Sequence, residues 1–344
     1  MIRSNTLKTL AVALAFAGTT IMVGTATPAS AAKVQMKIAN AVPGKAPRGQ
    51  GGDKVAEMVN ADKRCDVNAK TYHGGQLGGT TDLVEGLQIG SIEMVILPGS
   101  FLVGFQPLIG IMDFPFFWPP QRENLSKIHK SNAMKKLLDT TEEKGVVSVA
   151  IWHTGYKVWT GNKPLNEFAN YAGLKARVMP SAVLKEQFRL FGVTPVGMPF
   201  AETYGALQNK AIDAQENPIT TNFFMKFHEV QDYMALTNHG TLDQVIMLSK
   251  GWWDKRSSAC QVAIREAIDA GGKLTTDLTY SIINSKALPI FQKAKIKVVD
   301  VSKANFEAMK SKVLPGVEKF YVEQNGAKGK AILDAFKIEL AKLK

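Results

Sequence analysis

Three residues between positions 157 and 217 carry side chains that can hold an acidic small molecule. Arg177 has a guanidinium group that stays protonated at physiological pH, and its planar fork of N–H groups matches both oxygens of a carboxylate. Asn217 can supply an amide donor and an acceptor, and Lys157 supplies a movable positive charge with less geometric selectivity. By spacing alone, Arg177 is more typical of an exposed arginine on a strand. For Asn217 the alternative to a binding role is a helix-breaking turn formed with Pro218. The chemistry that these side chains favour is the binding of an anion.

Sequence signatures of catalysis are absent from the chain. It has neither a GxxxxGK(S/T) phosphate loop nor an HExxH zinc helix, and the glycine run at 74–79 lacks the GxGxxG spacing of a dinucleotide site. Ser100 does not stand in a GxSxG nucleophile elbow, and the five histidines are dispersed. We therefore expect no enzyme, no catalytic residue, no metal and no cofactor, and we rank a secreted hydrolase well below a binding protein.

The composition is that of a globular chain with a basic surplus. Of the 344 residues, 45% are hydrophobic and 21% are charged, which excludes a mainly disordered chain, a collagen-like chain and a small disulfide scaffold. The formal net charge of +12 suits nucleic acid, an anionic membrane or anionic small solutes. Because the basic residues are spread along the chain, with no arginine-rich arm and no aromatic ribonucleoprotein motif, we expect no nucleic-acid partner.

The N-terminal sequence has the three-part layout of a secretory signal peptide over residues 1–31. Arg3 and Lys8 give a positive start, Leu10 to Val23 is apolar, and Ala29-Ser30-Ala31 matches a small-residue cleavage site. The apolar run is about 14 residues, short of the roughly 20 that a membrane-spanning helix needs. We therefore expect the protein to be exported.

The two cysteines, Cys65 and Cys260, lie in the exported part of the chain. An oxidising compartment would let them pair, and the bridge would close a long loop. Two buried free thiols fit the sequence equally well, so both alternatives stay open. The cysteines do not have the CxxC spacing of a zinc or redox site.

Strands and helices alternate along the chain, which predicts an α/β fold with a parallel or mixed sheet. Arg177 lies on one expected strand, and Asn217 follows another. In the last long helix, Gly271-Gly272 predicts a bend. The expected strands are 34–40, 67–72, 92–97, 146–152, 157–160, 174–179, 212–214, 244–248 and 296–301. The longer expected helices are 49–64, 80–90, 121–144 and 258–286.

Apolar side chains are expected to form the walls of such a site, because ligand clefts are mostly apolar with a few convergent polar groups. Each candidate is equally suited to a packed core. Val42 and Ser100 join them because they follow predicted strands, and ligands of open α/β sheets lie beyond the carboxyl ends of strands. The apolar candidates are Phe114, Phe116, Trp152, Met179 and Phe200.

Several short segments, taken in order, resemble the substrate-binding proteins of TRAP transporters, the DctP-like family. Each motif alone is weakly specific, and their common order carries the match, which spans essentially the whole exported chain. The segments are Gly75-Gln76-Leu77-Gly78, Asp113-Phe114-Pro115-Phe116-Phe117, WHTGYK at 152–157, GLKARVM at 173–179, PFAETYGALQ at 199–208 and IDAQENP at 212–218.

This resemblance implies a two-lobed periplasmic binding-protein fold with a ligand cleft between the lobes. Such a receptor closes on a small organic acid and delivers it to membrane-embedded TRAP transporter subunits. We expect lobe I to comprise residues 32–154 plus 243–282 and lobe II residues 155–242 plus 283–344, joined by several crossings. A ligand-sensing receptor that feeds a signalling partner is the alternative, because a fold does not fix the partner.

The resemblance also implies roles for the three polar residues. The family's invariant carboxylate-binding arginine falls on Arg177, and its cleft asparagine falls on Asn217. Where members commonly carry a second arginine, this chain has Lys157, which leaves the second anchor and the ligand open. Dicarboxylates, 2-oxo acids, sugar acids and aromatic acids all fit, and the aromatic wall candidates favour an apolar or aromatic monocarboxylate.

Overall fold

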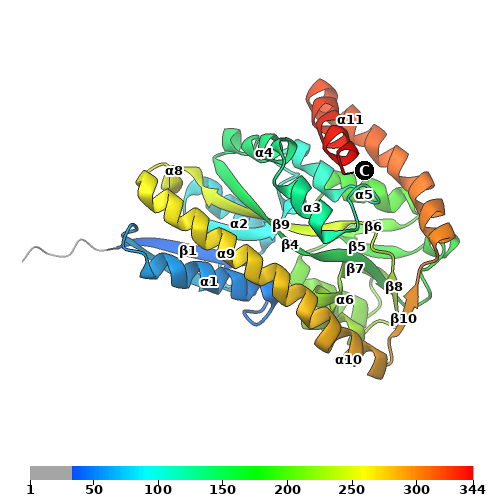
Figure 1. Cartoon of the computed structure of the whole chain (residues 1–344). Coiled ribbons are helices and arrows are strands. Elements are labelled where there is room, and N and C mark those ends of the chain that lie inside the picture. Colours follow the sequence, from blue (N-terminus) through cyan, green and yellow to red (C-terminus); the bar gives the residue numbers. More distant parts are fainter. Residues whose placement is uncertain (1–32, 344) are drawn as a thin grey trace, which may run out of the picture. The chain divides into compact units, whose positions relative to one another are not determined.

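The structure is a computed structural model, and it describes residues 33–343 (Figure 1). The predicted signal peptide lies outside the described residues. One mixed sheet has the strand order β2-β1-β3-β9-β4-β7-β5-β6, with β8 paired to β4 and β10 paired to β8. The strands are β1 (Val34–Asn40), β2 (Val67–Tyr72), β3 (Met94–Pro98), β4 (Val146–Gly161), β5 (Lys175–Val178), β6 (Thr194–Gly197), β7 (Ala214–Pro218), β8 (Tyr233–Leu236), β9 (Thr241–Ser249) and β10 (Lys297–Asp300).

Strand β4 joins two halves of this sheet. It pairs antiparallel with β9 from Val146 to Tyr156, and then antiparallel with β7 from Lys157 to Gly161. We call β2, β1, β3 and β9 the first half, and β7, β5, β6, β8 and β10 the second half. Both halves contain parallel pairs, β1 with β2 and β3 in the first and β5 with β6 and β7 in the second. The predicted α/β class with a mixed sheet is confirmed.

Strand β4 is one strand of 16 residues where the sequence predicts two. Its register with β9 shifts between His153 and Tyr156, and Gly155 in that interval has φ of +110°. A bulge of this kind bends a strand without ending it, and the positive φ favours glycine. The predicted break between two strands is therefore a bulge, and β4 continues from one half into the other.

Helices flank the strands, and α9 lies along α1 and extends from α8 towards α10 (Figure 1). The single helix expected over 121–144 is two helices, because Ser131 caps the second one by accepting a hydrogen bond from the Met134 backbone. The helices are α1 (Pro47–Ala61), α2 (Thr80–Ile89), α3 (Arg122–His129), α4 (Asn132–Asp139), α5 (Ala182–Leu190), α6 (Thr203–Gln208), α7 (Ile219–Phe224), α8 (Lys250–Trp253), α9 (Ser258–Ile282), α10 (Leu288–Lys293) and α11 (Lys303–Ala341).

Helix α9 runs through Gly271-Gly272 as regular α-helix, so the predicted bend is wrong. A Cβ atom on Gly272 would lie 2.6 Å from the Trp152 ring, and one on Gly271 would lie 2.7 Å from the Gly51 carbonyl oxygen. Glycine is needed here because α9 packs this closely against β4 and α1. The glycine pair marks a close helix contact.

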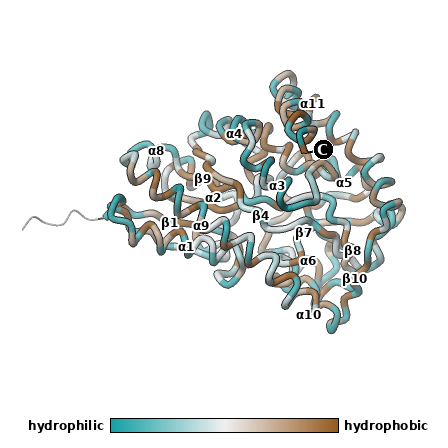
Figure 2. The backbone as a smooth tube through the Cα atoms, viewed as in Figure 1, coloured by the Kyte–Doolittle hydropathy of each residue, from teal (hydrophilic) through white to brown (hydrophobic). Residues whose placement is uncertain are grey.

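Helix α11 buries one face and exposes the other. Met309, Val313, Val317 and Tyr321 follow one another at intervals of four and are buried, and Figure 2 shows hydrophobic and hydrophilic residues alternating along this helix. The helix is kinked at Gly326, whose φ is +58°. Within residues 33–343, no helix is both long and apolar enough to cross a membrane.

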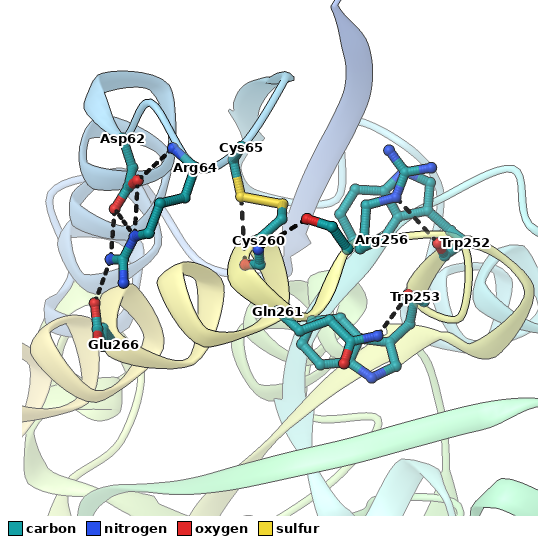
Figure 3. Close-up of a disulfide and its surroundings, with 10 residues drawn as sticks. Asp62, Arg64, Cys65, Trp252, Trp253, Arg256, Cys260, Gln261 and Glu266 are labelled. Carbon is teal, nitrogen blue, oxygen red and sulfur yellow. Dashed lines mark hydrogen bonds and ion pairs between the residues drawn. A yellow bond between two sulfur atoms is a disulfide. The ribbon is translucent and has the colours of Figure 1, made fainter.

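A disulfide joins Cys65 to Cys260 and so ties the segment after α1 to the first turn of α9 (Figure 3). Of the two alternatives that the sequence leaves open, the structure therefore has the bonded one. Both cysteines are buried, and Arg64 beside them pairs with Asp62 and Glu266. Because the bridge spans a sequence separation of 195, it removes many conformations from the unfolded chain.

Opening this disulfide should lower the free energy of unfolding by about 4–5 kcal/mol, because the unfolded chain regains the entropy of a long open loop. Urea unfolding of the oxidised protein and of the Cys65→Ser/Cys260→Ser double variant checks this. Reductant should lower the midpoint of the wild-type protein and leave that of the double variant unchanged. Equal midpoints for all samples would contradict the prediction.

Candidate functional site

A small cavity lies where the two halves of the sheet meet. The space between its walls, counted together with the part that opens to solvent, is about 270 Å³, and the walls come from both halves. Four of the predicted site residues line it together: Arg177, Asn217, Met179 and Phe200. The remaining lining residues are Ala41, Arg48, Thr80, Leu97, Pro98, Phe101 and Leu242.

Arg177 enters this cavity from β5, a strand held between β6 and β7. The side chain is 3% exposed, and its guanidinium lies 5.4 Å from the centre of the Phe200 ring. Within the described part of the chain, Nε and Nη2 have no hydrogen-bond partner. Burial lowers the pKa of Arg177 to about 10, although the charge of Glu216 opposes that shift. A buried cation with two free donors is costly until an anion reaches it.

Asn217 lies within β7, one residue before its end, and not in a turn after a strand as predicted. Its Nδ2 donates to Gln215 Oε1 at 2.6 Å, and its carbonyl oxygen accepts from Asn222 Nδ2 at 3.0 Å. Gln215 in turn donates to Thr160 Oγ1 and Asn222 Oδ1, both at 2.7 Å. This buried network fixes the orientation of the Asn217 amide beside the cavity.

Arg48 is a lining residue that the sequence does not reveal. It is the second residue of α1, it is 6% exposed, and its Nη1 donates to Gln244 Oε1 at 2.5 Å. Its Nε has no partner among residues 33–343, and burial lowers the pKa of Arg48 to about 10. The predicted helix begins one residue later, at Gly49, and no motif includes Arg48. Its role depends on residues far away in the chain, so local sequence carries no signal for it.

The electrostatic character of the cavity follows from its lining. Two guanidinium groups reach it, and none of its lining residues within the described chain is acidic. The carboxylate whose charge acts on Arg177 is that of Glu216, and the Lys157 ammonium already contacts it. The lining therefore combines two cationic groups with mainly apolar residues, which suits an organic anion.

Lys157 does not line this cavity. Its ammonium lies 2.6 Å from Glu216 Oε1, and the other oxygen of that carboxylate lies 2.6 Å from His239 Nε2 and 2.8 Å from Gln187 Nε2. Lys157 and Glu216 are 1% and 3% exposed. The structure thus gives the Lys157 ammonium a buried partner, the Glu216 carboxylate on the adjacent strand β7.

Four further wall candidates lie outside the cavity. Phe114 packs edge-on against Phe117 and Tyr321, with ring centres 5.4 and 5.1 Å apart, and Phe116 packs in the same way against Phe306. Trp152 fills the space that the α9 glycines leave. Val42 lines a second cavity of about 320 Å³, which shares Arg48 with the first. Phe114, Phe116 and Trp152 are core residues here.

Ser100 is also outside the cavity, because its hydroxyl is bound to a buried carboxylate. Ser100 Oγ donates to Asp113 Oδ1 at 2.5 Å, and Asp113 Oδ2 has no partner in the part of the chain that the structure describes. Burial raises the pKa of Asp113 to about 6, against the opposing effects of Lys157, Ser100 and Ser181. The carboxyl group is therefore neutral below pH 6 and an unfavourable buried charge above it.

Replacing Asp113 by Asn should stabilise the protein above pH 6. The folded-state pKa of about 6 exceeds the ordinary value of 3.8, so the free energy of unfolding of the wild-type protein falls by about 3 kcal/mol as the pH rises through this interval. The side-chain amide of Asp113→Asn does not titrate, so this variant does not lose that stability. Urea unfolding of both proteins should show a gain for Asp113→Asn that is about 1–2 kcal/mol larger at pH 8 than at pH 5. A gain independent of pH would contradict this.

A larger groove near α3 and α9 is less suited to an anion. It holds about 1800 Å³, and its lining includes His129, His153 and several charged residues. Its lining includes the acidic residues Glu123, Asp269 and Asp277. Its two histidines contact Asp243, and Asp277 contacts Lys273 and Arg122. The small cavity differs because its two buried cations keep free N–H groups.

Comparisons with known proteins agree with the resemblance read from the sequence motifs. Residues 38–324 match the model of the bacterial extracellular solute-binding proteins, family 7. The C4-dicarboxylate-binding periplasmic protein DctP of Rhodobacter capsulatus is 30% identical over 92% of this chain and 95% of its own length. A TRAP periplasmic solute-binding protein from Desulfovibrio salexigens with bound orotic acid superposes with a TM-score of 0.87 at 31% identity, over 91% of this chain and 100% of that one. One from Shewanella oneidensis with bound succinate gives a TM-score of 0.83 at 28% identity, over 90% and 100% of the two chains. The chain belongs to family 7 of the bacterial extracellular solute-binding proteins.

Proposed function

We propose that this protein is a periplasmic receptor that binds an organic acid in the cavity of Arg177 and delivers it to the membrane subunits of a TRAP-type transporter. The observation that carries the proposal is the buried Arg177 guanidinium, whose Nε and Nη2 have no partner within residues 33–343. A carboxylate placed there would accept two parallel, charge-assisted hydrogen bonds. The Asn217 amide, held in place beside it, would contact the same ligand.

Known relatives support an acidic ligand. The Rhodobacter protein is described as binding C4-dicarboxylates, and the two superposed structures hold orotic acid and succinate. These ligands differ in shape and in the number of acidic groups, and a carboxylate is their common feature. The lining of this cavity has two cations and, within residues 33–343, no acidic residue, which fits that common feature.

Closure of two lobes would couple binding to delivery. We propose lobe I as residues 32–154 plus 243–282 and lobe II as residues 155–242 plus 283–344, with export directed by residues 1–31. Arg177 and Asn217 then belong to lobe II, whereas Leu97 and Pro98 belong to lobe I and line the same cavity. A ligand that contacts both walls binds the closed form more tightly and shifts the balance towards it.

Calorimetry and thermal unfolding of the purified protein test this function. Succinate, L-malate, orotate, galactonate and benzoate serve as acids, with choline and glycerol as cationic and neutral controls. We expect at least one acid to bind and to raise the melting temperature, because a ligand that binds only the folded state stabilises it. Binding of choline or glycerol in preference to every acid would overturn the proposal.

A further inference from the structure

We propose that Arg48 is the second ligand anchor and that Gln244 is its positioning residue, so that the cavity selects acids with a second oxygen-bearing acceptor group opposite the first carboxylate. This inference rests on the proposed function, in which Arg177 holds the first carboxylate. It assigns the second anchor to helix α1 and not to the position of Lys157, whose ammonium is bound to Glu216.

The first support is the state of the Arg48 guanidinium. The side chain is buried to 6% exposure, and its Nε has no partner in the described range 33–343. Among these described residues, the one hydrogen-bond partner of its side chain is the neutral amide of Gln244, which does not compensate the charge. Arginine donors that are buried, charged and free are the groups that a bound oxyanion satisfies.

The second support is the set of hydrogen bonds that orients the Gln244 amide and, through it, the Arg48 side chain. Gln244 is fully buried on β9, and its Nε2 donates to Thr154 Oγ1 at 2.9 Å and to the Leu242 carbonyl oxygen at 3.2 Å. The Thr154 hydroxyl itself donates to Leu242, so it can only accept from Gln244. The amide is thereby fixed with Oε1 towards Arg48, and it holds Nη1 at 2.5 Å.

The third support is the placement of the two arginines. Arg48 comes from α1 next to the first half of the sheet, and Arg177 comes from β5 in the second half, yet both line one cavity. The side chains of Leu97, Phe101 and Leu242 line the same space and suit a short carbon skeleton. An acid with acceptors at both ends would accept hydrogen bonds from both guanidinium groups at once. An acid with one such group would leave the free N–H donor of Arg48 without a partner.

Arg48 also separates this cavity from the second one. It is the residue that the two linings share, and the second lining is otherwise apolar or carries threonine hydroxyls. A guanidinium at that position limits the length of the ligand, because an apolar tail that passes it would strip its remaining hydration. The two-ended acid is therefore a short one.

Calorimetric titration with matched acids tests the inference. Succinate, succinamate and butyrate differ only at one end, and orotate and galactonate are added as acids of other shapes. We expect the wild-type protein to prefer the probe with a second acceptor over its truncated analogue by about 10-fold or more. Arg48→Met should lower the affinity for that probe about 30-fold or more and reduce the preference to below about 3-fold. Arg48→Lys should restore part of the affinity, because the charge returns without the fork.

The Gln244 variants separate positioning from general packing. Gln244→Leu should weaken binding of the two-ended probe by about 10-fold and leave that of butyrate unchanged. Gln244→Glu should weaken binding of the two-ended probe more strongly, because the introduced carboxylate would form an ion pair with Arg48 in place of the ligand. A Gln244→Leu protein that loses affinity for all probes equally would show a structural role only and would overturn this assignment.

The outcomes distinguish this inference from the proposed function. If Arg177→Met abolishes binding while Arg48→Met changes neither affinity nor preference, the second anchor is overturned and the proposed function stands. If none of the acids binds the wild-type protein, both are overturned. Arg189→Met, which alters an arginine whose side chain is 59% exposed, is the matched control and should change nothing.

Discussion

Replacing Arg177 by Met should abolish carboxylate binding in calorimetry, with a loss of affinity of about 100-fold or more. Truncating one partner of a buried, hydrogen-bonded charge pair typically costs about 2–5 kcal/mol, because the other charge is left buried and unpaired. In this protein the ligand carboxylate would lose the two donors that the structure leaves free, Nε and Nη2, within the described residues. Arg177→Lys should retain a small part of the affinity, because an ammonium supplies charge without the planar fork.

The same substitution should leave the empty protein folded and somewhat more stable. Among the residues that the structure describes, no counter-ion contacts the buried Arg177 guanidinium. Exchanging such a charge for an apolar side chain is expected to stabilise the folded protein by roughly 1–3 kcal/mol. Thermal unfolding should therefore show a raised melting temperature for Arg177→Met without ligand, and no further rise when ligand is added. A lowered melting temperature together with intact ligand binding would contradict both parts. Arg189→Met again serves as the exposed control.

Replacing Lys157 by Met should lower the free energy of unfolding by about 3–5 kcal/mol, because it leaves the buried Glu216 carboxylate without its ammonium partner. The effect is expected on folding and not on a ligand contact, since Lys157 does not line the cavity. The Lys157→Met/Glu216→Gln double variant removes both charges and should be less destabilised than the single one. Urea unfolding measures all three proteins.

The destabilisation caused by Lys157→Met depends on pH through the Glu216 carboxylate. Burial by itself would raise the pKa of Glu216, but Lys157 and His239 lower it to about 2. That value lies below the ordinary 4.5, so the stabilisation is complete above pH 4.5 and is lost as pH falls towards 2. The gap between wild type and Lys157→Met should therefore narrow in acid. If Lys157→Met instead weakens ligand binding and leaves the free energy of unfolding unchanged, the prediction is contradicted and Lys157 contacts the ligand.

The sequence predicts the framework of the site well, because the relevant strands are short apolar runs bounded by turns. The strand expected at 174–179 is β5, and it carries Arg177 into the cavity beside Met179. The strand expected at 212–214 begins two residues early and ends four residues early, since β7 extends to Pro218. Asn217 and Pro218 are still paired with β4, and the strand ends at Pro218, directly before α7, so the expected break falls at this dipeptide.

The wall candidates show where local reasoning ends. Phe114, Phe116 and Trp152 are buried as predicted, but a buried aromatic ring serves a core as readily as a ligand wall, and here they pack on Tyr321, Phe306 and the α9 glycines. Of the four aromatic residues behind the preference for an aromatic monocarboxylate, these three lie in the core and the fourth, Phe200, lines the cavity.

The partners of the charged residues are equally hidden in the sequence. Lys157 and Glu216 are 59 residues apart, and Arg48 and Gln244 are 196 apart. The pairing of β4 with β7 brings the first two together, whereas the second contact joins helix α1 to strand β9.

The most direct test is a crystal structure of the protein with the most tightly bound acid from the calorimetric panel. We expect one carboxylate of that acid within hydrogen-bond distance of Arg177 Nε and Nη2, with Asn217 beside it and the far end of the molecule towards Arg48. An acid bound in the groove of His129 and His153, or anywhere without contact to Arg177, would contradict the proposed site.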